Sequence, residues 1–160
     1  MTKSDAAMIP KRGKMHEAFA IFLGDWKAEG TSYGGTDQSG ADPRANGVPW
    51  KSTHTGRWHT GEFFLIQDEH ADLDGALFDT LSVIGVEEDG SGYFARSFEN
   101  HGFYRHYALS VDGARWTLTG DTERATTIFS NGNRKQDIVW EWKADGKWLP
   151  LFERTAVRQD

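Results

Sequence analysis

Closely spaced turn signals divide most of this chain into short segments, and that spacing restricts the folds open to it. Turns rich in Asp, Asn and Gly lie at 73–75, 88–90, 100–102, 112–113, 131–133 and 145–146. Such turns join consecutive antiparallel strands, whereas parallel strands need crossover helices, which the sequence does not show. We predict strands from Trp26 onward and at 50–60, 62–70, 76–86, 93–99, 103–111, 115–120, 126–129, 137–143 and 148–157. The chain is therefore expected to be all-β, with roughly ten antiparallel strands in up-and-down order that close into a barrel and leave no free edge.

A short helix is predicted before the first strand. Residues 15–23 carry an apolar face at helical spacing, made of Ala18, Phe19, Phe22 and Leu23. Gly24 is suited to ending that helix, and from Trp26 the period changes to two. One face of the first strand then carries Trp26, Ala28, Gly30 and Ser32. We expect the helix to close one end of the barrel, with Trp26 in its floor.

The remaining organisation is simple. Residues 1–14 are polar and contain Pro10 and Gly13, which predicts a flexible tail, and residues 15–160 are expected to form a single domain. Residues 34–49 are rich in Gly, Asp, Asn and Pro. Long loops of this kind inside a domain often serve as lids or binding loops, so we expect this one to lie over one mouth of the barrel.

The composition of the chain restricts the classes of function open to it. Seven Trp and an aromatic content of 13% indicate a core or cavity lined by rings. The net charge is −6 and there is no basic stripe, which argues against nucleic-acid binding. No segment predicts a membrane span or a signal peptide. The absence of Cys excludes disulfides and fits a reducing compartment, so we expect a cytoplasmic protein.

Several predicted strands have apolar residues on both faces, as at 63–66. A barrel with a fully wet exterior should alternate more cleanly. We therefore expect part of the outer wall to be covered, either by the loop at 34–49 or by the second subunit of a homodimer.

The segment Leu23-Gly24-Asp25-Trp26-Lys27-Ala28-Glu29-Gly30 resembles the L-G-x-W-x-G-x-G opening of calycin-type barrels, which include lipocalins, fatty-acid-binding proteins and nitrobindins. More closely, the chain resembles an uncharacterised bacterial group, domain-of-unknown-function family 1579. The features that it shares are Gly56-Arg57-Trp58, the strand at 65–68 and a closing run with Trp148, Pro150, Glu153 and Arg158. Ala28 replaces the usual glycine of the family. The resemblance implies a calycin-like barrel of about ten strands with an interior cavity, and no established activity.

In lipocalin-like barrels an arginine of the last strand lies across the indole of the G-x-W motif. The resemblance therefore implies that Arg154 or Arg158 lies across Trp26, as a structural closure of the barrel and not as a functional site. Cation–π stacking and guanidinium bonds to carbonyls at the helix end would stabilise such a contact.

The densest polar and aromatic stretch is residues 101–107, where Phe103, Arg105 and Tyr107 share a face. A buried Arg beside a Tyr hydroxyl needs an anion or a carboxylate. One interpretation is that Arg105 and Tyr107 bind the carboxylate of an apolar ligand, with the other ligand-binding residues being Phe103, Trp140, Phe78 and Glu69. The alternative is that Arg105 pairs with Glu99 or Glu69, or that this face lies outside.

The histidines do not predict a metal site or a cofactor. His54 and His59 are an odd number of residues apart, as are His101 and His106, so a regular strand points the members of each pair to opposite faces. Residues 149–157 contain no His, which argues against haem bound as in nitrobindins. Surface histidines, or buried ones with satisfied hydrogen bonds, are the expectation.

Three functions are compatible with these features. The first is a barrel that holds a small apolar or amphipathic molecule in an aromatic-lined cavity. The second is a cavity enzyme of lyase or isomerase type, in which Glu69, Glu99, Arg105 and Tyr107 supply acid–base chemistry. The third is a structural or dimerisation module without a ligand.

Overall fold

The hairpin turns show why the chain reverses so tightly. Asp74 and Gly75 have φ angles of 53° and 90°, and Asp145 and Gly146 have φ angles of 50° and 78°. Two consecutive residues with positive φ form the hairpin turn whose twist matches its flanking strands. Asp and Gly tolerate this conformation better than other residues, so the two dipeptides place sharp reversals where the sequence analysis expects them.

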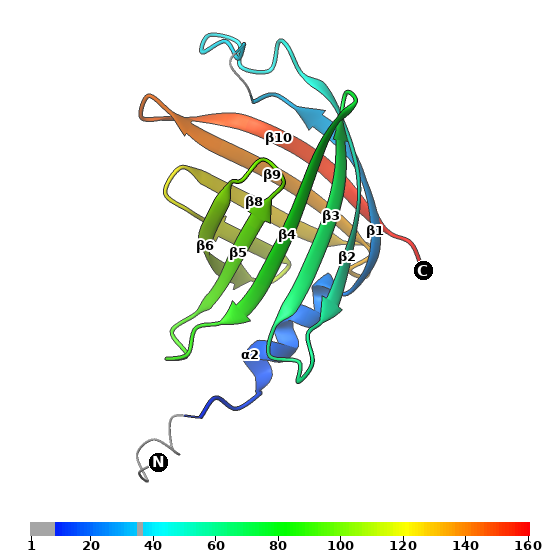
Figure 1. Ribbon diagram of the computed structural model, residues 1–160, viewed down its shortest axis with the longest axis vertical. Helices are drawn as coiled ribbons and strands as arrows, with labels where there is room; N and C mark the ends of the chain where they lie inside the picture. The colour runs from blue at the N-terminus through cyan, green and yellow to red at the C-terminus, as the bar shows by residue number, and fades with distance from the viewer. Residues whose placement is uncertain (1–8, 35–36) are drawn as a thin grey trace.

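The structure, a computed structural model, describes residues 9–34 and 37–160 and contains a closed barrel of ten strands (Figure 1). The strands are β1 (Gly24–Ser32), β2 (Val48–Trp58), β3 (Leu65–Leu73), β4 (Ala76–Val86), β5 (Tyr93–Glu99), β6 (Tyr104–Asp112), β7 (Arg115–Thr119), β8 (Glu123–Ser130), β9 (Lys135–Ala144) and β10 (Lys147–Arg158). Each pairs antiparallel with the next, and β1 pairs with β10. The predicted all-β, up-and-down barrel is confirmed.

One predicted strand begins too early. Residues 62–64 form part of a turn, in which the backbone N–H of Glu62 donates to the carbonyl of His59 at 2.9 Å. Gly61 and Glu62 both have positive φ, 91° and 60°. The apolar run at 63–66 concealed this boundary, because Phe63 packs in the turn against the ring of His16, 5.3 Å away.

The predicted helix consists of two short pieces, α2 (Lys14–Glu17) and the 3₁₀ turn η1 (Ala18–Phe22). A 3₁₀ turn places residues three apart on one side, and Phe19 and Phe22 are both buried. Phe22 contacts the rings of Trp116 and Phe129 at 5.0 and 5.3 Å, and Phe19 contacts Tyr93 at 5.2 Å. The helical segment lies at the lower end of the barrel in Figure 1, and its buried rings pack on those of the strands, so it closes that end as predicted.

The first strand alternates as its sequence suggests. Trp26 and Ala28 are buried, whereas Lys27 and Glu29 are exposed. Gly30 has a different role, because a Cβ at this position would lie 1.9 Å from the carbonyl oxygen of Glu153. The close approach of β10 to β1 therefore requires a residue without a side chain here.

The resemblance implies that Arg154 or Arg158 lies across the indole of Trp26, and the structure arranges these residues differently. The ring stacked on Trp26 is that of His54, with centroids 5.9 Å apart. Arg158 is the strand partner of Trp26, and its guanidinium lies so close to Gly24 that a Cβ there would be 2.8 Å from Nε. Arg154 points into the barrel and stacks on Trp50 and Phe152. The alternation of β10 explains this, since Phe152, Arg154 and Ala156 share its inner face.

Two segments outside the barrel, the N-terminal residues 1–14 and the loop at 34–49, are described in part. Residues 1–8 of the predicted tail lie outside the described residues, and Lys14 already belongs to α2. Arg12 stacks on the ring of Trp58 at 5.4 Å. In the loop at 34–49, residues 35–36 lie outside the described residues. Gln38 ties this loop to β9 and β10, because it accepts from Trp142 Nε1 and donates to the Pro150 carbonyl, both at 2.7 Å.

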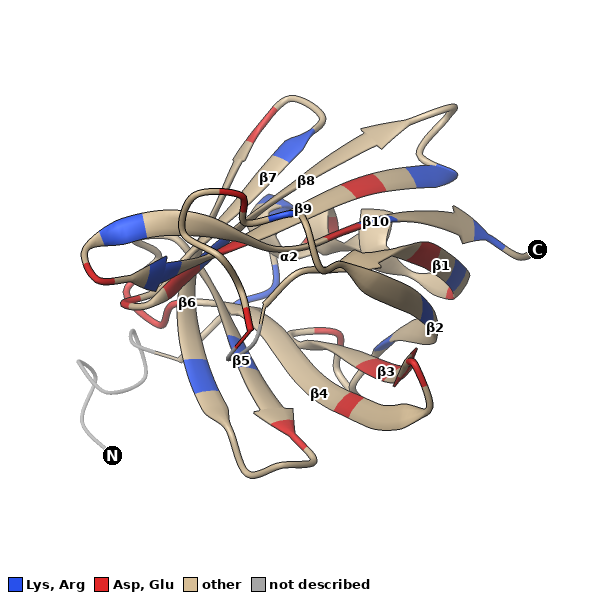
Figure 2. Cartoon of the chain, turned by 90° about the horizontal axis from the view of Figure 1, so that it is seen from above, with Lys and Arg blue, Asp and Glu red and all other residues tan. Residues whose placement is uncertain are grey.

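Charged residues of both signs are interspersed over the strands and turns, as Figure 2 shows. Among the described residues, no helix has the length and apolar character needed to cross a membrane. The cytoplasmic location stays a prediction.

Candidate functional site

The barrel interior holds a cavity of about 480 Å³. It lies above Phe22, and its wall is formed by the inward-facing residues of the strands. Its aromatic lining residues are Phe22, Trp50, Phe78, Phe103, Tyr107, Trp140 and Phe152. The turns at the end opposite the helical segment surround its mouth, where Phe103 is 51% exposed. Ring side chains therefore wall a hollow, and the core does not fill it.

All six residues proposed from the sequence as ligand-binding line this cavity: Glu69, Phe78, Phe103, Arg105, Tyr107 and Trp140. They come from β3, β4, the β5–β6 turn, β6 and β9. Tyr107 and Trp140 contact each other edge to face at 5.3 Å. Whether they bind a ligand stays a proposal, but the structure brings them together around one space.

The first polar group in the cavity consists of Arg105, Tyr107 and Glu123. Tyr107 Oη donates to Glu123 Oε2 at 2.7 Å, and Arg105 Nε lies 3.4 Å from Glu123 Oε1. Burial, followed by the neighbouring Glu123 carboxylate, raises the pKa of Tyr107. The partner of Arg105 is thus Glu123, on β8, instead of the expected Glu99 or Glu69. Glu123 is not among the predicted site residues, because this strand begins at Glu123 and was predicted to begin at residue 126.

The second polar group lies deeper, around Arg154. Its guanidinium contacts the carboxylate of Glu69, and Arg154 Nη1 lies 3.3 Å from Ser52 Oγ. The rings of Trp50 and Phe152 stack on each other at 4.4 Å and both lie beneath the guanidinium. Burial lowers the pKa of Arg154 to about 9, while the Glu69 carboxylate favours the charged form, so the guanidinium stays charged at neutral pH.

His54 completes this group. It is buried between Trp26 and the cavity, and its Nδ1 lies 3.8 Å from Glu69 Oε2 without a hydrogen bond. Burial, followed by the charge of Arg154, lowers the pKa of His54 to about 3, so the ring is neutral at pH 7. The sequence offered one usable signal for it, because Trp50, Ser52 and His54 alternate on one face of β2.

Glu99 and His101 form a third group near the mouth. The backbone N–H of His101 donates to Glu99 Oε1 at 2.6 Å, and the His101 ring contacts the same oxygen. The other oxygen, Glu99 Oε2, is buried and has no hydrogen-bond partner in the described part of the chain. The ring of Phe78 lies 5.3 Å from that of His101.

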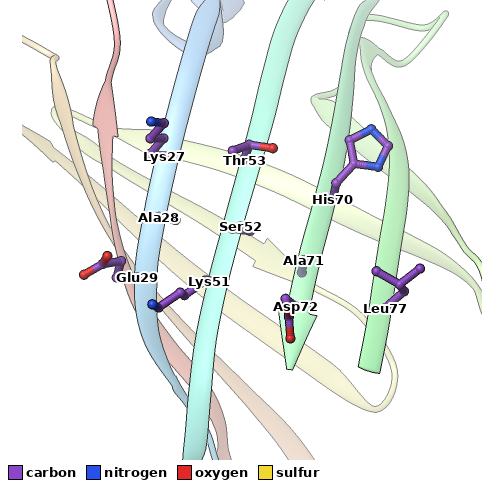
Figure 3. Close-up of a pocket in the computed structure, with 10 residues that line it drawn as sticks. All are labelled: Lys27, Ala28, Glu29, Lys51, Ser52, Thr53, His70, Ala71, Asp72 and Leu77. Carbon is purple, nitrogen blue, oxygen red and sulfur yellow. The ribbon is translucent and has the colours of Figure 1, made fainter. Parts of the chain in front are cut away.

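A second hollow, of about 330 Å³, lies on the outer wall across β1, β2, β3 and the start of β4 (Figure 3). Its labelled side chains include Lys27, Glu29, Lys51, His70 and Leu77, which project from the outer surface of the strands. It is open and bordered by long, solvated side chains. This groove therefore lacks the enclosure of the interior cavity.

The described residues contain no group of three or more His, Asp or Glu side chains arranged to hold a metal ion. His70 contacts Asp79 at 3.1 Å and Asp68 at 3.6 Å on the exterior. The hydrogen bond to Asp79 is the main cause that raises the pKa of His70.

The outer wall also carries exposed apolar residues. Leu81, Phe98 and Tyr104 are paired across β4, β5 and β6, and the rings of Phe98 and Tyr104 lie 5.2 Å apart. This outer patch agrees with the excess of apolar residues noted in the sequence. The homodimer stays a prediction, which sedimentation velocity would test.

The comparisons with known proteins support the fold of this chain and nothing more specific. The chain is similar to the structure of the S-type phycobiliprotein lyase CPES from Guillardia theta, with a TM-score of 0.59 and 11% sequence identity over 100% of this chain and 99% of that chain. No family model matches the chain, and no curated protein matches its sequence. The likeness supports a calycin-like barrel, while the resemblance to domain-of-unknown-function family 1579 stays a prediction.

Proposed function

We propose that this protein binds a small, largely apolar molecule inside its barrel. The observation that carries the proposal is the cavity of about 480 Å³, which is walled by rings and open at one end. Its volume lies within the range of about 300–1,000 Å³ that ligand sites usually have. Apolar and aromatic walls provide most of the binding free energy at such sites, and a few fixed polar groups orient the ligand.

The proposed contacts divide by depth. Phe78, Tyr107 and Trp140 pack against the apolar body, while Phe103 and Arg105 contact the ligand at the mouth. In the deep part of the cavity, Glu69 contributes by holding the guanidinium of Arg154, with which it is in contact. A ligand carboxylate at Arg105 and Tyr107 is the less favoured version, because Glu123 already accepts from Tyr107 and contacts Arg105. An anionic ligand would have to compete with that carboxylate.

A fluorescence titration with N-phenyl-1-naphthylamine, a neutral aromatic probe, tests the proposal. We expect saturable binding to the wild-type protein. Ser82→Trp places an indole in the cavity and should weaken binding at least about tenfold, a change of about 1.4 kcal/mol. Leu81→Trp, on the outer face of the same strand, should bind as the wild type does. Equal binding by both variants would place the probe outside the cavity and reject the proposal.

A second candidate is acid–base catalysis of lyase or isomerase type in the same cavity. It is supported by the contact between Tyr107 and Glu123 at 2.7 Å, which places a carboxylate beside a phenol and an arginine. The structural neighbour is named a lyase, a precedent for chemistry on this fold. The test incubates a metabolite extract with wild type and Glu123→Gln and compares products by mass spectrometry. Identical product profiles would reject catalysis by Glu123.

A further inference from the structure

Three carboxylates line the cavity in the described part of the chain, and they differ in how their charge is balanced. Glu69 contacts Arg154, and Glu123 contacts Arg105. Glu99 has no such arginine or lysine contact among the described residues, and its side chain is only 6% exposed. Its neighbour His101 engages one oxygen, from the solvent side of the mouth. Glu99 thus lines the cavity with one carboxylate oxygen, Oε2, that is buried and has no donor among the described residues.

The position of this carboxylate is fixed before any ligand arrives. The backbone N–H of Glu99 donates to the Phe103 carbonyl at 3.0 Å, and the N–H of Gly102 donates to the Glu99 carbonyl at 2.9 Å. The backbone N–H of His101 then holds Oε1. The two backbone bonds thus fix the hairpin, and the bond from His101 holds Oε1, which leaves Oε2 as the oxygen without a donor. A carboxylate oxygen withdrawn from water and lacking a donor is unfavourable, and a ligand that supplies the donor gains affinity.

We propose that Glu99 Oε2 binds a protonated amine, or an equally strong N–H donor, at the polar end of the ligand. This inference rests on the proposed function, since it names the chemistry of the molecule in the cavity. The Phe78 ring, which packs near His101, lies where it can add a cation–π contact. The charge of the cavity lining also favours a cationic ligand. The lining carries two arginines and a neutral, buried His54. It carries three carboxylates, those of Glu69, Glu99 and Glu123. A cation restores the balance, whereas an anion increases the excess negative charge.

Three probes of nearly equal shape separate the alternatives: 1-naphthylmethylamine, 1-naphthylmethanol and 1-naphthoate. Each competes with N-phenyl-1-naphthylamine at pH 7. We expect the amine to bind at least about tenfold more tightly than the alcohol, and naphthoate to bind most weakly. Glu99→Gln keeps the acceptor for the His101 N–H but removes the charge. It should reduce the affinity for the amine about tenfold and change that for the alcohol less than about threefold.

Glu88→Gln is the matched control, because Glu88 is exposed in the β4–β5 turn, and it should leave all three affinities unchanged. An amine preference that is absent in the wild type, or that survives in Glu99→Gln, overturns the inference while probe binding upholds the proposed function. Failure of the wild type to bind any of the probes overturns both. If Glu99→Gln does not fold, Glu99→Asp shortens the side chain by one methylene and must also reduce the amine preference.

Discussion

Replacing Glu69 by Gln should destabilise this protein strongly, because Arg154 would remain charged and unpaired inside the barrel. The two side chains are in contact and only 13% and 11% exposed. Removing one member of a buried ion pair usually destabilises a protein by about 3–5 kcal/mol. The cavity opens to solvent at its mouth, so water can reach part of the exposed charge. We therefore expect a loss near the lower end, about 3 kcal/mol, from Glu69→Gln and a similar loss from Arg154→Met.

The double variant Glu69→Gln/Arg154→Met should lie within about 1 kcal/mol of the wild type, since it leaves no uncompensated charge. Urea unfolding followed by tryptophan fluorescence measures all four proteins and yields the coupling free energy. Arg124 and Glu141 form the control pair, 2.8 Å apart and 43% and 35% exposed, for which we expect a coupling below about 1 kcal/mol. A coupling for Glu69 and Arg154 no larger than the control would refute the reasoning.

Three further predictions concern the core and the strand contacts. The unfolded chain binds a proton on His54 below pH 6.5 and the folded protein only near pH 3, so stability should fall as the pH drops between these values, by about 5 kcal/mol at the lower end. Urea midpoints from pH 7 to pH 4 should fall less steeply for His54→Gln, and parallel curves would contradict this. Phe22→Ala should lower the free energy of unfolding by about 3–5 kcal/mol, measured by calorimetry, because the Phe22 ring packs on Trp116 and Phe129. A loss below about 1 kcal/mol would mean that this ring does not seal the barrel. Gly30→Ala should lower the free energy of unfolding by about 3 kcal/mol or more, because the new Cβ clashes with the β10 backbone. Gly40→Ala, whose Cβ meets open space, is the control and should leave the stability unchanged. Equal stabilities of the two variants would show that β1 and β10 do not approach closely.

Most of the barrel follows from local signals. Asp-Gly turns fix where strands reverse, and the period of two groups the residues that share a face, such as Phe103, Arg105 and Tyr107. The period left open whether that face lies inside, and these three residues line the cavity. The start of β3 was wrong because Phe63 and Phe64 continue an apolar pattern through a turn. Turn geometry there depends on positive φ at Gly61 and Glu62, and Glu is not a residue that predicts it.

The partners of the charged residues could not be read from the sequence. Either Arg154 or Arg158 was expected on Trp26, but such contacts depend on the register and stagger of strands that are distant along the chain. β10 places Arg154 opposite Gly30 on one side and Ile138 on the other. Its side chain contacts Ser52 on β2 and Glu69 on β3, beyond the neighbouring strand β1. The link between Arg105 and Glu123 has the same origin, because it joins β6 to β8 across the intervening β7.

A crystal structure of the protein with N-phenyl-1-naphthylamine tests the central claim most directly. The account predicts probe density inside the barrel, among Trp50, Tyr107 and Trp140. Density found only over the outer groove of Figure 3, near Lys27 and Lys51, or an interior filled by the protein's own side chains, would contradict it.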